Sequence, residues 1–514
     1  MLVKTYGAAV QGIDAIEVAI EVEVDKGIGV AIVGLPDTAV KESQERVRSA
    51  LKQVGMEFPR RHVVVNMSPA DVRKEGSAYD LPIAVGVAVA GGLITVPTLQ
   101  GFLIMGELAL DGSVLPVRGA LPMAIMARAK GYKAMILPEA NANEAAVVNN
   151  LSVYGVRHIS QVFEILSGTS ALNPVIIDTR AEFSKAEHTD ALDFRDVKGQ
   201  AQVKRALEVA CAGGHNILLV GPPGAGKSMM AKRVPTILPP FTLAEALETT
   251  KIHSVAGKLH RGSMLMTRRP FRSPHHTISP VALVGGGTDP MPGEISLAHN
   301  GVLFLDEFPE FSRGVLEVMR QPLEDRHITI SRARYTIDYP AGFMLVASMN
   351  PCPCGYYNHP TKQCTCTPGT VQKYLSRISG PLLDRIDLQI EIFPVPFQEL
   401  SDDTPCETSE AIRRRVMAAR DIQQRRFADH PHVHCNAMMT PAMLRRYAMP
   451  DPEAMQRLEA AIRKFDLSAR AYDRILKVAR TIADLDSAQT INKTHIAEAI
   501  SYRNLDRSSW GKTF

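Results

Sequence analysis

A glycine-rich segment in the middle of the chain has the residues needed to bind nucleotide phosphates. It follows the apolar run Ile217–Val220, which is typical of a buried strand, and it precedes a predicted helix. The segment reads Gly221, Pro222, Pro223, Gly224, Ala225, Gly226, Lys227 and Ser228. Glycines let backbone N–H groups approach phosphate oxygens, and the helix N-terminus adds partial positive charge. The segment predicts a site for ATP and Mg²⁺, with Lys227 on the β- and γ-phosphates and Ser228 on the metal.

Two later apolar runs also end in polar side chains. Asp306 and Glu307 follow Val302–Leu305, and Asn350 follows a run that starts at Phe343. An aspartate at a strand end can hold Mg²⁺, an adjacent glutamate can polarise the attacking water, and an amide can sense the γ-phosphate. The alternatives are a helix N-cap for the acidic pair and a turn residue for Asn350. Their order behind a phosphate loop favours the catalytic interpretation.

Two pairs of arginines compete for the remaining roles in hydrolysis. Arg385 is flanked by acidic residues, and such an arginine usually makes a local ion pair. Its position after Asn350 favours a finger that reaches the ATP of a neighbouring subunit and stabilises transition-state charge, with Arg377 as the second candidate. Arg470, which opens a predicted helix, is the candidate lid residue on the γ-phosphate, and Arg474 competes with it.

Four of the seven cysteines form two Cys-x-Cys pairs. They are Cys352, Cys354, Cys364 and Cys366. Four thiolates match a tetrahedral Zn²⁺ site, although four unrelated cysteines are the alternative. Gly355, Pro360 and Gly369 prevent a long helix here, so a metal ion is the natural source of stability for this segment. His359 is a spare candidate ligand.

Segment 327–340 alternates apolar and polar residues and carries Arg332 and Arg334 near its centre. It predicts a β-hairpin with a basic tip. An ordinary edge hairpin also carries such charges, but the place of this one, just before a catalytic strand, favours DNA contact. A second polar insert precedes Asp306. It contains Arg268, Arg269, Arg272, His275 and His276.

Composition is that of a globular protein with two or three domains: 514 residues, 45% hydrophobic and 22% charged. The net charge of +4 does not indicate a nucleic-acid binder, but segment 413–426 is rich in arginine. That cluster is either a solvated helix face or a DNA contact. The longest apolar run, Leu81–Ile94, is shorter than the roughly 20 residues of a spanning helix. We therefore expect a cytoplasmic protein that is not in the membrane.

The pattern of elements changes along the chain. Residues 1–170 mix helices with strands such as Glu17–Val24, and 171–193 read as a polar linker. From Phe194, short apolar runs alternate with helices, which predicts a parallel sheet covered on both faces. We expect an ATPase core over 194–400, with the cysteine insert at 352–366, and a helical lid over 401–514.

The motifs together resemble those of the ComM/YifB proteins, the magnesium-chelatase-like group of AAA+ ATPases, over nearly the whole chain. The segments that carry the resemblance are Gly221–Ser228, Leu303–Glu307, Asn350–Cys366, Ser376–Asp387 and Ser468–Leu485. The resemblance implies an α/β AAA+ fold, a P-loop parallel sheet with a helical lid, in a hexameric ring with ATP at subunit interfaces. It also implies inserted hairpins near 273–293 and 327–340. The implied function is a DNA motor, a branch-migration helicase of homologous recombination and natural transformation with recombination proteins as partners.

The N-terminal segment is similar to the proteolytic domain of Lon, an α+β fold of the ribosomal S5 domain 2-like type. The similarity lies in Gly106–Leu108, Val114–Val117 and Lys133–Asn141. Lon needs a Ser–Lys dyad, but here Ala78 falls at or near the place of the nucleophile, and no lysine lies in Arg118–Met123. Ser77 then has no neighbouring base to activate it. We expect a proteolytically inactive domain that serves ring assembly or DNA binding.

A chelatase-type protein remodeller is the alternative function, because its motor core would look much the same. Such a motor needs neither a Lon-like domain nor a four-cysteine module. A third function, ATP-dependent proteolysis, is disfavoured by the missing dyad.

Overall fold

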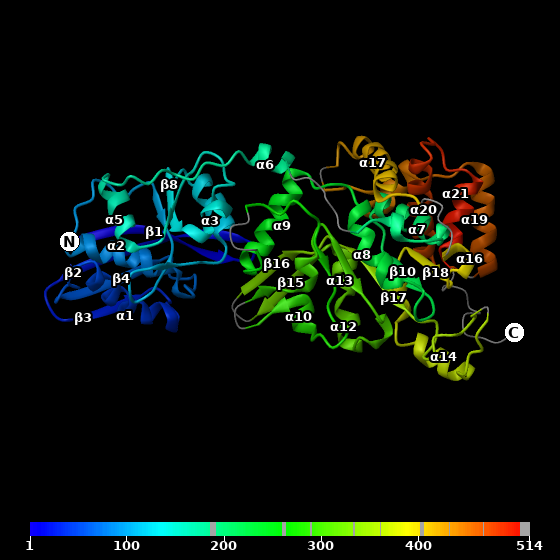
Figure 1. Cartoon of the computed structure of the whole chain (residues 1–514), viewed down its shortest axis with the longest axis horizontal. Helices are drawn as coiled ribbons and strands as arrows, with labels where there is room; N and C mark the ends of the chain where they lie inside the picture. The colour runs from blue at the N-terminus through cyan, green and yellow to red at the C-terminus, as the bar shows by residue number, and fades with distance from the viewer. Residues whose placement is uncertain are drawn as a thin grey trace.

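The computed structural model describes residues 1–185, 192–259, 264–287, 290–332, 335–359, 361–400, 406–430, 432–465 and 467–503. The described chain is elongated, with the N-terminal third at one end, a parallel sheet in the middle and the C-terminal helices at the other end (Figure 1). Buried hydrophobic side chains form three clusters, one in the N-terminal third and two on opposite faces of the central sheet.

A four-stranded sheet with the order β1-β2-β4-β3 forms the base of the N-terminal part. The strands are β1 (Leu2–Gln11), β2 (Asp14–Asp25), β3 (Gly29–Val33) and β4 (His62–Ser68). The predicted alternation along β2 is confirmed, because Val18, Ile20, Val22 and Val24 are buried. Helix α1 (Thr38–Gln53) begins at the side chain of Asp37, and α2 (Asp80–Ala90) is buried over its whole length against β1 and β2.

Smaller sheets complete this part. A parallel sheet contains β5 (Phe102–Ile104), β8 (Ala134–Pro138) and β9 (Ser152–Val156), and a hairpin contains β6 (Glu107–Leu108) and β7 (Val114–Leu115). The helices are α3 (Ala120–Ala129), α4 (Glu139–Ala145) and α5 (Ile159–Ser167).

The predicted linker contains a helix that the sequence reading did not include. Helix α6 spans Thr179–Lys185. The carboxylate of Asp178 accepts the backbone N–H groups of Arg180 and Ala181, and the Thr179 hydroxyl donates to the carbonyl of Val147 at 2.9 Å. A cap and one tertiary hydrogen bond thus order a segment that has no apolar period.

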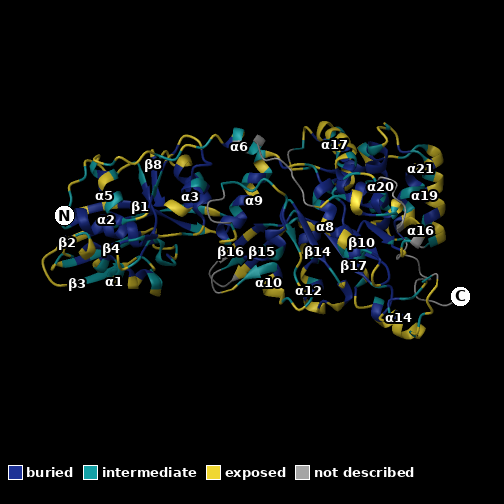
Figure 2. Cartoon of the chain, viewed as in Figure 1, coloured by how far each residue is buried: buried dark blue, intermediate teal, exposed yellow. Residues whose placement is uncertain are grey.

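The central sheet has five parallel strands in the order β11-β14-β17-β10-β18. They are β11 (Phe271–Arg272), β14 (Val302–Leu305), β17 (Met344–Met349), β10 (Ile217–Val220) and β18 (Leu388–Glu391). Strands β10, β14 and β17 are buried throughout (Figure 2). Successive residues of β10 alternate between the two hydrophobic clusters, so both faces of the sheet are covered, as predicted.

Helices and two inserts surround this sheet. The helices are α7 (Ala201–Gly213), α8 (Lys227–Ile237), α9 (Leu243–Val255), α10 (Pro280–Val284), α11 (Glu294–Leu297), α12 (Arg313–Val318), α13 (Arg320–Asp325), α14 (Pro368–Leu375), α15 (Gly380–Leu383) and α16 (Phe397–Leu400). The first insert pairs β12 (Gly285–Gly286) with β13 (Met291–Pro292), and the second pairs β15 (His327–Arg332) with β16 (Tyr335–Pro340). Both implied hairpins are therefore present, and the first is only two residues long on each side.

The C-terminal helices pack on one face of the sheet. They are α17 (Ser409–Arg426), α18 (Pro441–Tyr447), α19 (Pro452–Phe465), α20 (Ala469–Leu485) and α21 (Lys493–Ser501). Helix α19 begins after Asp451, whose carboxylate accepts the Ala454 N–H at 2.7 Å. Helices α17 and α20 contact α7, and their buried side chains join the cluster under the sheet.

The arginine-rich helix α17 is bound mainly to its own chain. Arg426 pairs with the buried Asp484, and Arg415 pairs with Glu208. Arg420 donates to the carbonyl of Cys211 at 3.1 Å. These contacts use the guanidinium groups to hold the helix in place, which weakens the interpretation of segment 413–426 as a DNA contact.

The N-terminal part meets the core at α9 and at the second hairpin. The Gly119 N–H donates to the carbonyl of Ser254 at 3.2 Å, and the Ser254 hydroxyl donates to the buried carboxyl of Glu144. A Cβ on Gly12 would lie 2.9 Å from Ile337 in β16. The β1–β2 turn therefore touches the hairpin directly.

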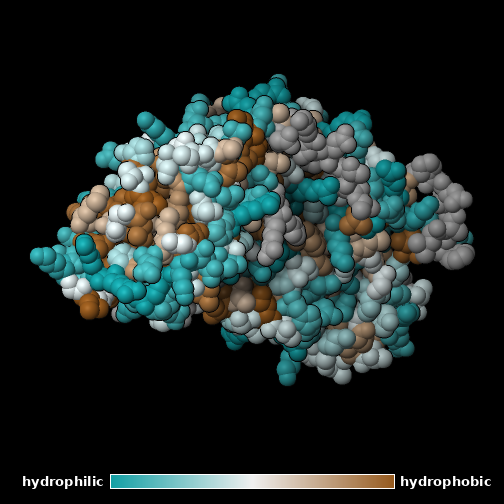
Figure 3. Space-filling model, turned by 60° about the vertical axis from the view of Figure 1, so that its left-hand side comes forward, coloured by the Kyte–Doolittle hydropathy of each residue, from teal (hydrophilic) through white to brown (hydrophobic). Residues whose placement is uncertain are grey.

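Within the described residues, none of the helices combines the length and the hydropathy that crossing a bilayer requires. On the face in Figure 3, hydrophobic patches are separated by hydrophilic atoms.

One buried ion pair ties helix α20 to the sheet. Arg474 lies 3.0 Å from the carboxylate of Asp387, which is 1% exposed and also accepts the Asn216 N–H at 3.0 Å. Burial opposes the ionisation of Asp387, but Arg474, His215 and Lys477 together outweigh it and lower the pKa of the carboxyl well below its usual range.

Removing this arginine leaves a buried charge without its partner. We expect Arg474→Ala to lower the free energy of unfolding of the core by about 3 kcal/mol, measured by chemical denaturation. Because the folded pKa of Asp387 is depressed, the loss is full at neutral pH and shrinks as the pH falls toward that depressed value. The matched control is Arg470→Ala, one turn earlier on the same helix and exposed. Equal stabilities for the two variants would contradict the prediction.

Candidate ATP-binding site

Three strand ends bring the predicted phosphate-site residues together at one edge of the sheet. The Lys227 ammonium donates to the carbonyls of Gly221 at 2.7 Å and Pro222 at 2.9 Å, and to the amide oxygen of Asn350 at 3.1 Å. Burial lowers the pKa of Lys227, while the charges of Asp306 and Glu307 oppose that shift. The lysine is thus fixed between the loop after β10 and the residue after β17.

The oxygen ligands expected for Mg²⁺ lie beside the lysine. The Ser228 hydroxyl donates to the carboxylate of Asp306 at 2.7 Å, and the Ser348 hydroxyl donates to the other oxygen of that carboxylate. A hydroxyl and a carboxylate at this spacing are ligands that Mg²⁺ prefers. The residues present therefore fit an Mg–nucleotide complex.

Glu307 has a partner that the sequence did not reveal. Its backbone is left-handed, with φ 53° and ψ 47°, and its carboxylate lies 3.2 Å from the ring nitrogen Nδ1 of His276. The ring of His276 lies 4.1 Å from that of His275, tilted by 34°, and makes an edge-to-face contact with Phe311. The first insert, which follows β11, thus contacts the carboxylate expected to polarise water.

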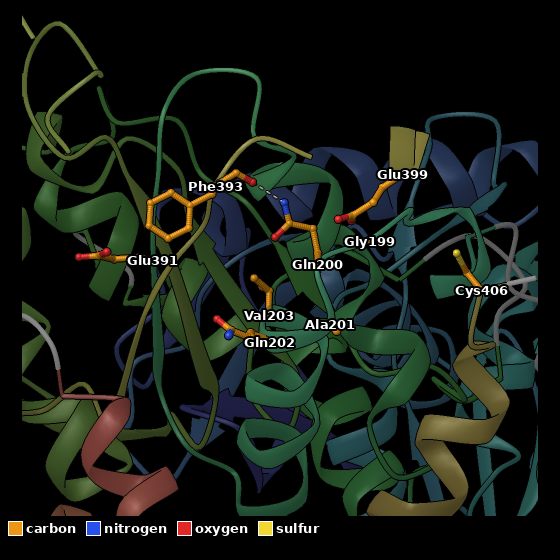
Figure 4. Close-up of a pocket in the computed structure, with 9 residues that line it drawn as sticks. All are labelled: Gly199, Gln200, Ala201, Gln202, Val203, Glu391, Phe393, Glu399 and Cys406. Atoms are coloured by element: carbon orange, nitrogen blue, oxygen red, sulfur yellow. Dashed lines mark hydrogen bonds between the residues drawn. The ribbon is translucent and has the colours of Figure 1, made fainter. Parts of the chain in front are cut away.

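The ATPase core contains a cavity of about 430 Å³ (Figure 4). It lies between the start of α7 and the end of β18, and its walls include Gly199, Gln200, Glu391 and Phe393. The Gln200 amide donates to the carbonyl of Phe393 at 2.6 Å. A Cβ on Gly221 would lie 2.5 Å from the carbonyl oxygen of Ile392, so the loop packs directly on this strand end. The sequence reading missed this cavity, because its walls carry no motif.

The two candidate fingers are both paired within this chain. The Arg385 guanidinium binds Glu324 and donates to the carbonyl of Pro381 at 2.7 Å, and its side chain is 14% exposed. Arg377 is 51% exposed and lies 2.8 Å from Glu310. Both guanidinium groups therefore rest on acidic residues of their own chain.

The two candidate lid arginines have different surroundings. Arg474 is occupied by Asp387, as described above, whereas Arg470 is exposed on the first turn of α20. Its side chain makes no ion pair with any residue of the described ranges. This contrast favours Arg470 as the residue available to a ligand.

The four cysteines of the insert lie close together, as their spacing in the sequence predicted. Their sulfur atoms all lie within 4.8 Å of one another. The candidate ligand His359 instead accepts backbone N–H groups from Thr361 and Lys362. The cluster therefore offers four thiols and no imidazole.

The predicted DNA-contacting arginines are only partly described. Arg332 is the last residue of β15, opposite Tyr335, and Arg334 lies outside the described residues. In the other insert, Arg272 pairs with Glu294 at 2.6 Å, and Arg269 binds Glu245 and three backbone carbonyls. Those two arginines support the fold.

In the N-terminal part, the partner of Ser77 is a carboxylate and not a lysine. The Ser77 hydroxyl donates to Glu107, a neighbouring basic group that the sequence did not reveal. The nearby Lys74 is fully buried, and its ammonium donates to the carbonyl of Pro69. These contacts do not form the Ser–Lys pair that Lon needs.

Comparison with known proteins identifies relatives of the entire chain. Three family models match: "Magnesium chelatase, subunit ChlI" over residues 193–400, "Subunit ChlI of Mg-chelatase" over 20–141, and "Magnesium chelatase, subunit ChlI C-terminal" over 406–503. The chain is 43% identical to the "Uncharacterized protein YifB" of Salmonella typhimurium and to the "Competence protein ComM" of Haemophilus influenzae, over 98% of each chain. It is 30% identical to the archaeal Lon protease of Thermococcus kodakarensis over 26% of this chain and 22% of that one.

The matches to YifB and ComM cover the whole length, and the match to Lon covers one part. They agree with an AAA+ sheet and lid joined to a Lon-like N-terminal domain, and they support an ATP hydrolase. The chain belongs to the ComM/YifB family of magnesium-chelatase-like AAA+ proteins.

Proposed function

We propose that this protein is an ATP-driven DNA motor, a hexameric branch-migration helicase that acts in the cytoplasm in homologous recombination and natural transformation. The observation that carries the proposal is the meeting of Lys227, Asp306 and Asn350 at one sheet edge, in a chain that matches a competence protein over its full length. DNA is the proposed track, and recombination proteins are the proposed partners.

Each residue of the edge has a proposed task. Lys227 neutralises the β- and γ-phosphates, Ser228 and Asp306 hold Mg²⁺, and Asn350 senses the γ-phosphate. Glu307, whose carboxylate lies beside His276, orients the attacking water. The cavity at Gln200 is the proposed place of the adenine base, because its wall residues Glu391 and Phe393 flank Ile392, which packs on Gly221 of the phosphate loop.

Hydrolysis is completed by residues from outside this edge. We assign the finger to Arg385 because of its position after Asn350. We assign the lid contact to Arg470, because Arg470 is exposed while Arg474 is paired with Asp387. The proposed units are an inactive Lon-like domain over 1–170, a linker over 171–193, the ATPase core over 194–400 and the lid over 401–514. Zn²⁺ at the four cysteines is the proposed structural metal.

A chelatase-type protein remodeller is the second candidate. It is favoured by the descriptions of the matching family models, which name a magnesium chelatase subunit. The two functions share the ATP site and differ in what stimulates it.

The first test compares ATP hydrolysis with different DNA molecules. We expect the rate to rise with DNA, most strongly with a four-way junction, and less with single strands and duplex. Lys227→Ala should abolish hydrolysis in every condition, because the phosphates lose their neutralising charge. A rate that is the same with every DNA would put the remodeller first.

The second test measures how DNA affinity depends on salt. If Arg332 and Arg334 contact phosphates, each change to glutamine should lower the slope of log affinity against log salt by about one unit. The control is Arg463→Gln, an exposed arginine of α19 that pairs with Glu459. A slope that stays at the wild-type value in both hairpin variants would indicate that these arginines belong to an ordinary edge hairpin and do not contact DNA.

The third test separates the finger from the phosphate site. Arg385→Ala should bind ATP but not hydrolyse it, because the finger acts on the neighbouring subunit. Mixing it with Lys227→Ala should restore part of the activity, since some interfaces then combine an intact loop with an intact finger. Arg377→Ala is the matched comparison, and restoration with that variant alone would transfer the role to Arg377.

A further inference from the structure

The sulfur atoms of the cysteine insert already lie at metal-binding distances. Cys352 is 3.3 Å from Cys354 and 3.7 Å from Cys364, and Cys354 is 3.5 Å from Cys364. In a tetrahedral site with Zn–S bonds of about 2.3 Å, neighbouring sulfur atoms lie about 3.8 Å apart. With Cys366 in the same group, one ion fits among the four thiolates.

The segment around these cysteines has little other support. Of the described residues from 353 to 367, Gly355 is the one that is buried, and most of the others are exposed. Without a hydrophobic core, a segment of this kind obtains its fold from the bound metal. The shape of the turn at Gly355 then depends on the ion.

That turn rests on the phosphate loop. Gly355 has φ 84°, and its N–H donates to the carbonyl of Cys352 at 3.0 Å. A Cβ at this position would lie 2.5 Å from Cδ of Pro223, the third residue of the phosphate loop. Only glycine suits both the left-handed backbone and this close approach.

Both ends of the segment are also anchored. Asn350, two residues before Cys352, accepts a hydrogen bond from Lys227. After the last cysteine, Tyr374 in α14 is 7% exposed and packs in the hydrophobic cluster on the face of the sheet opposite to the C-terminal helices. The segment therefore begins beside the proposed nucleotide site, contacts the phosphate loop and ends in a helix that packs on the core.

We propose that a thiophilic divalent ion of the Zn²⁺ class, held by Cys352, Cys354, Cys364 and Cys366, supports the phosphate loop through Gly355 and Pro223 and thereby sets the affinity for ATP. The inference rests on the proposed nucleotide site. It does not depend on DNA, so it stands or falls separately from the DNA motor.

The test measures metal content and nucleotide affinity without DNA. The full-length protein is analysed for zinc, stripped with a strong zinc chelator, exchanged into excess Mg²⁺ and titrated with a fluorescent ATP analogue. We expect one zinc per chain, affinity about tenfold weaker after stripping, and recovery when Zn²⁺ returns. An unchanged affinity in the stripped protein overturns the proposal.

Gly355→Ala tests the contact while keeping all four thiols. The strained backbone and the close approach to Pro223 should weaken the binding of the ATP analogue about tenfold, while the zinc stays bound. The matched control is Gly369→Ala, in α14 of the same region, where an added Cβ meets nothing within 4 Å. A Gly355→Ala protein that retains zinc and binds the analogue as the control does overturns the proposal, even if the stripped wild type unfolds.

Discussion

The parallel pairing of five buried strands is the constraint on which the site depends. Parallel strands end at the same edge, so the loop after β10, the acids after β14 and the amide after β17 must meet there. Buried apolar strands pin these ends, because a shift in register would move each side chain to the opposite face. Lys227, bonded to two loop carbonyls and to Asn350, then joins two strand ends in one geometry.

Two neighbouring segments are attached to this edge by short contacts. The first insert reaches Glu307 through His276, and the cysteine segment reaches the loop through Gly355. Helix α20 is bound at the opposite edge of the sheet, because its partner Asp387 lies just before the first residue of β18. The lid helix is therefore held at the edge where the strands begin, and the two segments are held at the edge where the strands end.

The sequence predicted the elements whose structure depends on residues close together in the chain. The alternation of β2, the buried run of β10, the hairpin at 327–340 and the cysteine cluster were all readable from the sequence, because periodicity and spacing are local properties. Contacts between distant parts of the chain could not be predicted in this way. Residues more than 30 positions apart meet in the His276–Glu307 pair, in the cavity at Gln200 and in the Arg474–Asp387 ion pair. Helix α6 was missed because its order comes from Asp178 and a contact with Val147.

The N-terminal domain has a physical role that needs no proteolysis. Its β1–β2 turn lies against Ile337, and the Ile13 side chain joins the cluster beneath the second hairpin. Its buried Glu144, whose pKa is raised by burial, accepts the Ser254 hydroxyl at the end of α9. Gly12 has no space for a Cβ beside Ile337, so the β1–β2 turn and the second hairpin are in direct contact. Together with the Glu144–Ser254 hydrogen bond, this contact ties the position of the N-terminal domain to two elements of the ATPase core.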